Sequence, residues 1–409
     1  MRILISAYAC EPGRGSEPGV GWNMARALAR QHQVTVLTSR THQPLTDREL
    51  ERHPDPNLRV VYLDPFGWVL SWATKPRGVY VHYYLWQVRA YFVARSLHRK
   101  QPFDVAHHLT YMKYSMPSFV SLLPIPFFMG PVGGGESAPK AFWSDLSPRA
   151  RAYEIVRNLA RRIGEWDPFT RLTLRRSVLV WAATEETAAR VKHVGCRRVE
   201  TESGMALDND ERELLERLPA PNAGAMRFIG IGRLLHWKGF HLALRALAAA
   251  DLPDAEYWIL GEGPARESLE ALAAELGIGD RVKFCGNLDR PDALATIGEC
   301  HVLLLPSLHD SGGWVFLEAM AAGRPVICAN LGGPPVQVTE ECGVRVAADS
   351  PKQTVRDLAA AMVRLDGDRA LCRRMGQAGQ LRVAEQLSWD HYAERAVHEY
   401  EQATGRAAP

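Results

Sequence analysis

Short apolar runs alternate with longer helical patterns along the whole chain. In the front half the apolar runs cover residues 2–9, 33–39, 58–63, 104–108, 125–130 and 178–184. A second series covers residues 226–232, 257–263, 281–286, 301–307, 325–330 and 343–347. Strands that alternate with helical segments are typical of parallel sheets with crossover helices. The pattern therefore predicts an α/β protein with two doubly wound, Rossmann-like domains.

The boundary between the two series lies near residues 205–225. Here a charged helical pattern gives way to Pro, Asn and Gly, which is the composition of a linker. At the end of the chain, apolar and aromatic residues recur at helical spacing. We expect one domain over 1–205, a second over 206–385 and a closing helix over 386–409. Two such domains offer a binding cleft where they face each other.

Composition and the cysteines restrict the class of protein. With 46% hydrophobic and 23% charged residues, the chain has the composition of a packed soluble protein. The seven cysteines form no CxxC pair and no zinc-like cluster with histidine, so we expect buried thiols in a reducing compartment. Residues 1–9 are too short an apolar run for a signal peptide, and prolines interrupt the uncharged stretch 114–135. We expect no membrane-spanning segment and a cytoplasmic location.

The charge is small overall but unevenly distributed. The whole chain carries +3, whereas residues 1–180 hold 24 Lys and Arg against 13 Asp and Glu. A basic half suits an anionic surface or acceptor, although an uneven solvated surface explains it equally well. Residues 79–100 and 149–176 combine aromatic residues with basic ones, which suits peripheral contact with the inner face of the cytoplasmic membrane. Helices that pack their aromatic residues inward are the alternative. The acidic back half argues against nucleic acid as a partner.

Two cations follow the first strand of the back half. Open α/β sheets bind ligands at the carboxyl ends of their strands, so this turn is a candidate site. Arg233 and Lys238 stand five residues apart just before a helical pattern. Together they could clamp a diphosphate and offset the charge that develops on its leaving oxygen. In isolation such a pair is more often simply solvated.

The next two strand ends carry small or flat groups. Gly261 and Gly263 permit a tight turn and close approach of backbone amides to a ligand. Asn287 and Leu288 follow a later strand, where they could frame a flat base. Neither signal is specific by itself.

The most specific signal lies in residues 303–333. A strand leads into a polar, glycine-containing turn, and a helix begins directly after it. The candidate residues are Asp310, Ser311, Gly312, Gly313 and, about one turn inside the helix, Glu318. Unpaired amides and the helix dipole at such a terminus suit a phosphate, and the carboxylate behind it can take a ribose diol.

Together, the motifs GRLLHWKG, LGEGP, DSGGWVFLEAMAAGRPV and SWDHYAE resemble retaining glycosyltransferase family 4 (glycosyl transferases group 1) of the bacterial polysaccharide type. The resemblance covers essentially the whole chain and implies the GT-B fold. It implies that Arg233 and Lys238 bind the donor diphosphate and that Glu318 binds the ribose hydroxyls. It also implies that the amides of 311–313 contact phosphate or sugar and that the last helix crosses back onto the first domain.

The resemblance also bears on mechanism. The family has a Glu-x7-Glu pattern, and Asp310 stands here in place of its first acid, one methylene shorter. The family implies retention at the anomeric carbon and needs neither a divalent metal nor another cofactor. We therefore expect no metal site. The triplet Asp208-Asn209-Asp210 imitates a metal-binding DxD motif, but it lies in the predicted linker and is set aside.

A glycine-rich loop follows the first strand of the chain. It imitates a dinucleotide fingerprint, but its spacing is not GxGxxG and no acidic residue clearly closes the second strand, which argues against NAD(P). In the family that the chain resembles, the equivalent loop approaches the donor phosphate or the acceptor. The corresponding candidates are Gly15, Ser16, Glu17 and Gly19.

Two further strand ends of the front half are candidates for the acceptor side. His107 and His108 end one strand, and a histidine there could orient the acceptor hydroxyl or the transferred sugar, although a histidine that is merely hydrogen-bonded is as good an interpretation. Similar subfamilies have a histidine at this strand end, and we favour His108 as the catalytic one. Another strand end supplies Gly133, Gly134, Gly135 and Glu136.

These observations predict a hexosyltransferase that moves a sugar from a UDP or GDP donor to a lipid-linked or polysaccharide hydroxyl, as in cell-surface or exopolysaccharide synthesis. Its catalytic residues would be Asp310, Arg233, Lys238 and His108. A nucleotide-sugar 2-epimerase of the same fold is one alternative. A degenerate binding protein is another, since Asp310 replaces a glutamate.

Overall fold

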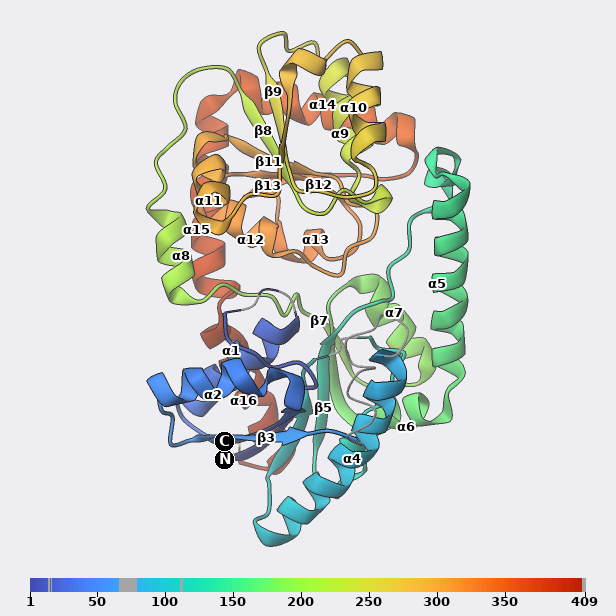
Figure 1. The fold of residues 1–409 in the computed structure, drawn as a ribbon, viewed down its shortest axis with the longest axis vertical. Helices are drawn as coiled ribbons and strands as arrows, with labels where there is room; N and C mark the ends of the chain where they lie inside the picture. Colours follow the sequence, from blue (N-terminus) through green and yellow to red (C-terminus); the bar gives the residue numbers. More distant parts are fainter. Residues whose placement is uncertain (14, 16, 66–78, 111–112, 407–409) are drawn as a thin grey trace. The chain divides into compact units, whose positions relative to one another are not determined.

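The computed structural model describes residues 1–13, 15, 17–65, 79–110 and 113–406. The chain divides into two compact units. The first consists of Met1–Gly135, Leu159–Gly204 and Trp389–Pro409, and the second of Glu136–Asn158 and Met205–Ser388. Figure 1 traces both units along the chain.

The first unit contains a parallel sheet of seven strands in the order β3-β2-β1-β4-β5-β6-β7. The strands are β1 (Arg2–Ser6), β2 (Gln33–Ser39), β3 (Leu58–Leu63), β4 (Val105–His108), β5 (Phe127–Val132), β6 (Ser177–Ala182) and β7 (Val199–Thr201). The order reverses between β1 and β4, whose carboxyl ends therefore form the topological switch point of this sheet.

Helices connect these strands. They are α1 (Glu17–Ala29), α2 (Gln43–Arg52), α4 (Val79–Lys100), α6 (Pro168–Arg176), α7 (Glu185–Val194) and α16 (Trp389–Thr404), with short 3-10 turns η1 (Arg40–His42) and η3 (Phe119–Leu122). α7 shows how the sequence sets both ends of a helix. The Thr184 side chain accepts a hydrogen bond from the amide of Thr187, and Gly195 ends the helix in the left-handed region with φ 116°.

Aromatic side chains fill the core on one side of this sheet. Tyr8 meets Tyr83 and Trp86 edge-on, with ring centroids 5.4 Å apart in both pairs. Tyr83 and Trp86 are fully buried and come from α4. Tyr83 and Trp86, two of the aromatic residues that suggested a membrane contact for 79–100, are thus core residues, as the alternative interpretation of that segment expected.

The second unit contains a parallel sheet of six strands in the order β10-β9-β8-β11-β12-β13. The strands are β8 (Arg227–Ile231), β9 (Glu256–Leu260), β10 (Val282–Gly286), β11 (Val302–Leu305), β12 (Val326–Ala329) and β13 (Gly343–Val346). The interior strands β11 and β12 are fully buried, which agrees with their uninterrupted apolar sequences. The switch point of this sheet lies between β8 and β11.

The remaining helices are α5 (Pro148–Trp166), α8 (Asn209–Glu216), α9 (Phe240–Ala249), α10 (Arg266–Glu275), α11 (Arg290–Glu299), α12 (Trp314–Ala321), α13 (Pro334–Gln337), α14 (Pro351–Gly367) and α15 (Arg369–Gln386). The 3-10 turns are η4 (Lys140–Asp145), η5 (His236–Lys238) and η6 (Gly279–Arg281). α5 begins in the second unit and ends in the first, because the division falls between Asn158 and Leu159.

The predicted fold class is confirmed: two parallel sheets with flanking helices follow the strand positions that the sequence pattern indicated. The charged helical pattern at the start of the expected linker forms α8, where Asp208 accepts a hydrogen bond from the amide of Glu211 and so caps the helix. One detail of the domain division differs. Residues 136–158 group with the second unit and not with the first, because Glu136 and Glu154 contact loops of the second sheet.

In the part of the chain that the structure describes, no helix combines the length and hydrophobicity that crossing a membrane requires.

Candidate functional site

The candidate site of the second unit is built on the switch point between β8 and β11. The loop after β8 and the loop after β11 are joined by a backbone hydrogen bond of 2.7 Å from Leu308 to Trp237. Lys238 Nζ donates to Asp310 Oδ2 across the same two loops at 2.6 Å. Both side chains keep about one sixth of their surface in solvent, at 17% and 16%. The structure thus brings together two residues that the sequence places 72 positions apart.

A pocket of about 570 Å³ lies at the carboxyl ends of β8, β9 and β10. It is lined by residues that the sequence analysis selected from three separate turns, namely Arg233, Gly261, Gly263, Asn287 and Leu288. Arg233 is exposed. Its guanidinium is therefore accessible to an anion in this pocket.

The glycines of this pocket are required by close approach of the backbone. Gly261 has φ 130°, and a Cβ there would stand 2.1 Å from the carbonyl oxygen of Gly232. A Cβ on Gly232 itself would lie 3.8 Å from Cε of Lys238, so the lysine flanks the pocket wall. A side chain at Gly261 would collide with the backbone of Gly232. The close packing of the ends of β8 and β9, next to the pocket, therefore requires glycine here.

Glu318, the predicted ribose ligand, faces the N-terminus of α11. Its Oε1 accepts from Arg290 at 2.5 Å, and Arg290 also pairs with Glu211 of α8. Burial opposes the charge of Arg290, but the two carboxylates outweigh this and raise its pKa. Because Arg290 follows Leu288 by two residues, this ion pair ties Glu318 to the rim of the pocket. The carboxylate is partly accessible, with 12% of its side chain exposed.

The turn after β11 is fixed by contacts at consecutive residues. Ser311 Oγ donates to Glu136 Oε2 at 3.0 Å, and the amide of Gly333 donates to the carbonyl of Asp310 at 2.7 Å. Gly312 and Gly313 follow, and α12 begins at Trp314 with Gly313 as its N-cap. No side chain caps this helix, so its first amides point into the turn. The structure places 310–313 as the sequence pattern expected, in front of a helix N-terminus.

A buried carboxylate, which the sequence analysis did not identify, supports both loops. Glu154 of α5 accepts from Nε2 of His309 at 2.9 Å and from Nε2 of His236 at 3.3 Å. Burial raises the pKa of this carboxyl, but the hydrogen bonds from both histidines outweigh burial and lower it to about 2. Trp237 packs in parallel between the rings of His309 and Tyr153. Glu154 therefore positions the residues next to Lys238 and Asp310.

Glu154, His236 and His309 also have the right donor set for a metal ion. Their ligand atoms all lie within 4.8 Å of one another. Two imidazole nitrogens and one carboxylate oxygen are ligands that zinc accepts. Both histidines bond Oε1, whereas Oε2 is buried without a hydrogen-bond partner and has the Arg157 guanidinium 3.7 Å away.

The two histidine candidates of the first unit form hydrogen bonds inside the protein. His108 is buried, and its ring nitrogens meet Tyr83 Oη and Ser6 Oγ, both at 3.1 Å. His107 is also buried, and it meets Tyr400 Oη at 2.5 Å and the carbonyl of Gly130 at 2.9 Å. Burial lowers the pKa of both histidines to about 3. The geometry does not support His108 as the catalytic histidine, because both of its nitrogens are engaged inside the protein.

The glycine turn after β5 is likewise held by protein groups. The carbonyl of Gly135 accepts from Arg161 at 2.9 Å and from Arg190 at 3.1 Å, and a Cβ at Gly135 would stand 2.5 Å from Cα of Thr187. Gly133 is buried and pairs with Lys113 through a bridge, and Gly134 is half-buried. Glu136 groups with the second unit, where its Oε2 accepts from Ser311 Oγ at 3.0 Å, and its role on the acceptor side stays a prediction.

The loop before α1 is described in part. Gly15 is exposed, Glu17 begins α1, and Gly19 is buried within that helix. Ser16 lies outside the described residues.

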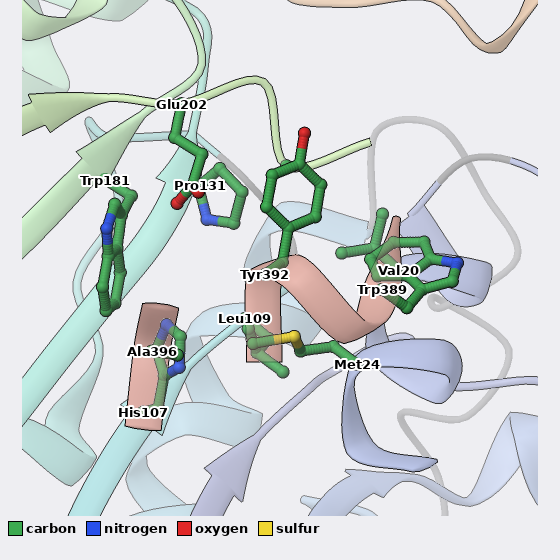
Figure 2. A pocket seen from close by; sticks show the side chains of 11 residues that line it. Val20, Met24, His107, Leu109, Pro131, Trp181, Glu202, Trp389, Tyr392 and Ala396 are labelled. Carbon is green, nitrogen blue, oxygen red and sulfur yellow. The ribbon is translucent and has the colours of Figure 1, made fainter. Parts of the chain in front are cut away.

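A small cavity of about 20 Å³ lies in the first unit, beside α16 (Figure 2). His107 and Trp181 line it from the sheet, Glu202 from the segment after β7, and Trp389 and Tyr392 from α16. The volume suffices for one water molecule. Glu202 pairs with Arg395 at 3.1 Å, yet burial dominates and raises its pKa to about 7.

The chain was compared with known proteins. A family model described as "Glycosyl transferases group 1" matches residues 215–382, which contain the pocket, Lys238 and Asp310. The chain is 30% identical over 260 residues to the lipopolysaccharide core biosynthesis glycosyltransferase LpsE of Rhizobium meliloti, covering 61% of this chain and 70% of that protein. The chain belongs to the glycosyl transferases group 1 family.

Two further proteins show how far the family likeness extends. The chain is 33% identical over 235 residues to the 2-deoxystreptamine glucosyltransferase of Streptomyces kanamyceticus, covering 56% of this chain and 59% of that protein, which is less than two thirds of its length. The sucrose-phosphate synthase structure from Thermosynechococcus elongatus has a TM-score of 0.65 at 18% identity, covering 99% of this chain and 100% of that one. The latter likeness shows the GT-B fold over nearly the whole chain.

Proposed function

We propose that this group 1 family member transfers a hexose from a nucleoside-diphosphate sugar to a hydroxyl of a glycan or lipid-linked acceptor, with retention and without a metal. The observation that carries the proposal is the Lys238–Asp310 pair beside a pocket lined by Arg233, at the switch point of the second sheet. Two cations, Arg233 and Lys238, beside an open pocket at this position suit a diphosphate.

The proposed reaction assigns a role to each side of the pocket. The bond between the anomeric carbon and the diphosphate oxygen breaks, and the acceptor oxygen forms the new glycosidic bond. The leaving diphosphate takes the proton of the acceptor hydroxyl. Arg233, Lys238 and the N-terminus of α12 offset the charge on the leaving group, while Glu318 holds the ribose and Asp310 faces the sugar. Catalysis in this scheme is positioning and electrostatics, with no protein nucleophile.

The relatives support the substrate class. One carries the name of a glucosyltransferase and the other that of a lipopolysaccharide core biosynthesis glycosyltransferase. Both names fit a hexose donor and a carbohydrate acceptor. A role in cell-surface polysaccharide synthesis is the corresponding proposal for this chain.

The test is a thermal-shift panel of UDP, GDP and ADP sugars, followed by a nucleotide-release assay in the presence of EDTA. The proposal expects one donor to stabilise the protein and to release its nucleoside diphosphate when an acceptor is added. Conversion of the donor without any acceptor would favour the 2-epimerase alternative. Absence of stabilisation by every donor would contradict the proposal and favour a degenerate binding protein. Loss of activity in EDTA that zinc restores would refute metal independence.

A further inference from the structure

The helix α5 turns its apolar side away from the protein. Four large apolar residues recur along it at a spacing of three and four, which places them on one face. Their exposed fractions are 66% for Val156, 58% for Leu159, 65% for Ile163 and 78% for Trp166. Ile155, exposed to 55%, extends this face. The alternative interpretation of this segment, in which the helices pack their aromatic residues inward, is wrong for Trp166.

The opposite side of α5 carries polar groups that bind the protein. Glu154 accepts from His309 and His236, Arg161 donates to the carbonyl of Gly135 at 2.9 Å, and Glu165 pairs with Arg190 at 2.9 Å. An ordinary surface helix buries its apolar stripe and exposes its charges. In α5 this arrangement is reversed, since its polar side contacts the protein and its apolar side faces solvent.

The apolar surface continues onto the neighbouring helices of the first unit. Phe169 and Leu172 of α6 are exposed, as are Val88 and Phe92 of α4. The two helices are linked, because Tyr84 of α4 meets the ring of Phe119 at 5.6 Å and Phe119 meets Phe169 at 5.3 Å. We call the exposed apolar residues of α4, α5 and α6 the apolar face.

The charges around the apolar face have one sign. Every exposed charged side chain in residues 148–176 is an arginine: Arg149, Arg151, Arg162, Arg171, Arg175 and Arg176. The three acids of this segment are engaged elsewhere. Glu154 is buried, Glu165 pairs with Arg190, and Asp167 caps α6 through the amide of Phe169. A stripe of apolar and aromatic residues bordered by arginines fits the headgroup region of an anionic bilayer.

We propose that the apolar face docks this protein on an anionic membrane, with its apolar residues in the headgroup region and the arginines of α5 and α6 on lipid phosphates. The arginines around the apolar face are complementary in charge to an anionic membrane, which favours a membrane as the partner. A second copy of the same face would set arginine against arginine, and like charges across an interface are unfavourable. The proposal does not require sugar transfer, but with the proposed function it would bring the enzyme to a lipid-linked acceptor.

The test is sedimentation of the full chain with vesicles, without any sugar donor. We expect binding to phosphatidylcholine vesicles that contain about one third phosphatidylglycerol and weak binding to pure phosphatidylcholine. The double variant Leu159→Glu with Ile163→Glu should lower the vesicle affinity about tenfold or more, since it puts two carboxylates into the docked stripe. Arg149→Gln with Arg162→Gln should lower it about fivefold for each arginine removed.

A matched control keeps the result interpretable. Val363→Glu with Leu381→Glu places the same two charges at exposed apolar positions of α14 and α15, outside the apolar face, and should leave vesicle binding unchanged. Unchanged melting temperatures would show that all variants are folded. Absence of binding to anionic vesicles, or equal binding by the Leu159/Ile163 variant and the parent, would overturn the proposal. So would a dimer in solution that the Leu159/Ile163 variant dissociates, because the face would then be a contact between copies. Since no donor is present, none of these results depends on sugar transfer.

Discussion

Replacement of Glu154 by glutamine is expected to weaken both loops of the candidate site. The change keeps the shape of the side chain and removes its charge. The pKa of Glu154 falls from 4.5 to about 2 in the fold, which corresponds to about 3 kcal/mol of stabilisation of the charged form. Only 1% of the side chain is exposed, so solvent does not screen the interaction. The amide oxygen of glutamine can still accept one hydrogen bond, and we therefore expect a loss of about 2 kcal/mol.

The effect has a defined pH dependence. The pKa of the folded state lies below that of the unfolded state, so the charge of Glu154 stabilises the protein above about pH 4.5. This stabilisation is lost as the pH falls towards 2. The difference in unfolding free energy between parent and Glu154→Gln should therefore be full at pH 7 and should shrink below pH 4.

Denaturant unfolding at pH 7 and donor binding by calorimetry check this prediction. Glu267→Gln is the matched control, because Glu267 is an exposed glutamate in the first turn of α10. The Glu154 variant should unfold with lower stability and bind the nucleoside diphosphate more weakly, whereas the control should behave as the parent. A Glu154 variant with the stability and affinity of the parent would refute the role of the carboxylate. Stoichiometric zinc in the purified protein would also refute it, because the histidines would then be metal ligands.

Other substitutions test separate parts of the structure. Lys238→Met should lower kcat/KM about 100- to 1,000-fold and weaken nucleoside diphosphate binding, as read by nucleotide release and calorimetry, with Lys352→Met unchanged. Asp310→Asn should lower kcat while nucleoside diphosphate affinity stays near that of the parent, and an equal loss of both would contradict a contact with the sugar. Glu202→Gln should raise stability by about 2 kcal/mol at pH 8 and leave it unchanged at pH 4. The carboxyl ionises near pH 4.5 in the unfolded chain but keeps its proton up to about pH 7 in the folded protein, so the parent loses stability as the pH rises through this window. Equal unfolding curves at pH 8 would contradict that prediction.

The sequence pattern was sufficient for most of the fold. Each apolar run that it selected became a strand, because a buried parallel strand needs a continuous apolar sequence and so leaves a clear signal. β7 was missed for the opposite reason. It has three residues, Val199, Glu200 and Thr201, each half-buried at the edge of its sheet, and one apolar residue in three has no detectable period.

The candidate site could be predicted where it depends on strand ends. Lys238 and Asp310 were both selected because each follows a strand of the same sheet, and the ends of parallel strands meet at one edge. Glu154 could not be found in this way. It lies in an arginine-rich helix and meets His236 and His309 at separations of 82 and 155 residues, contacts that exist only once the chain has folded. His108 was selected by the strand-end rule and is a core residue, because that rule says nothing about the direction of a side chain.

The contacts of 309–311 explain why residues 136–158 belong with the second unit. His309 bonds Glu154, Asp310 bonds Lys238, and Ser311 bonds Glu136, so three consecutive residues are each held by a different side chain. Two of those three side chains come from the segment 136–158, which leads into α5. One side of α5 thus supports the loop that contains residues 309–311, and the other side carries the exposed apolar residues. Because Glu154 and Leu159 lie on opposite faces of α5, donor binding and membrane docking can be perturbed separately, and a variant on one face should leave the property of the other unchanged.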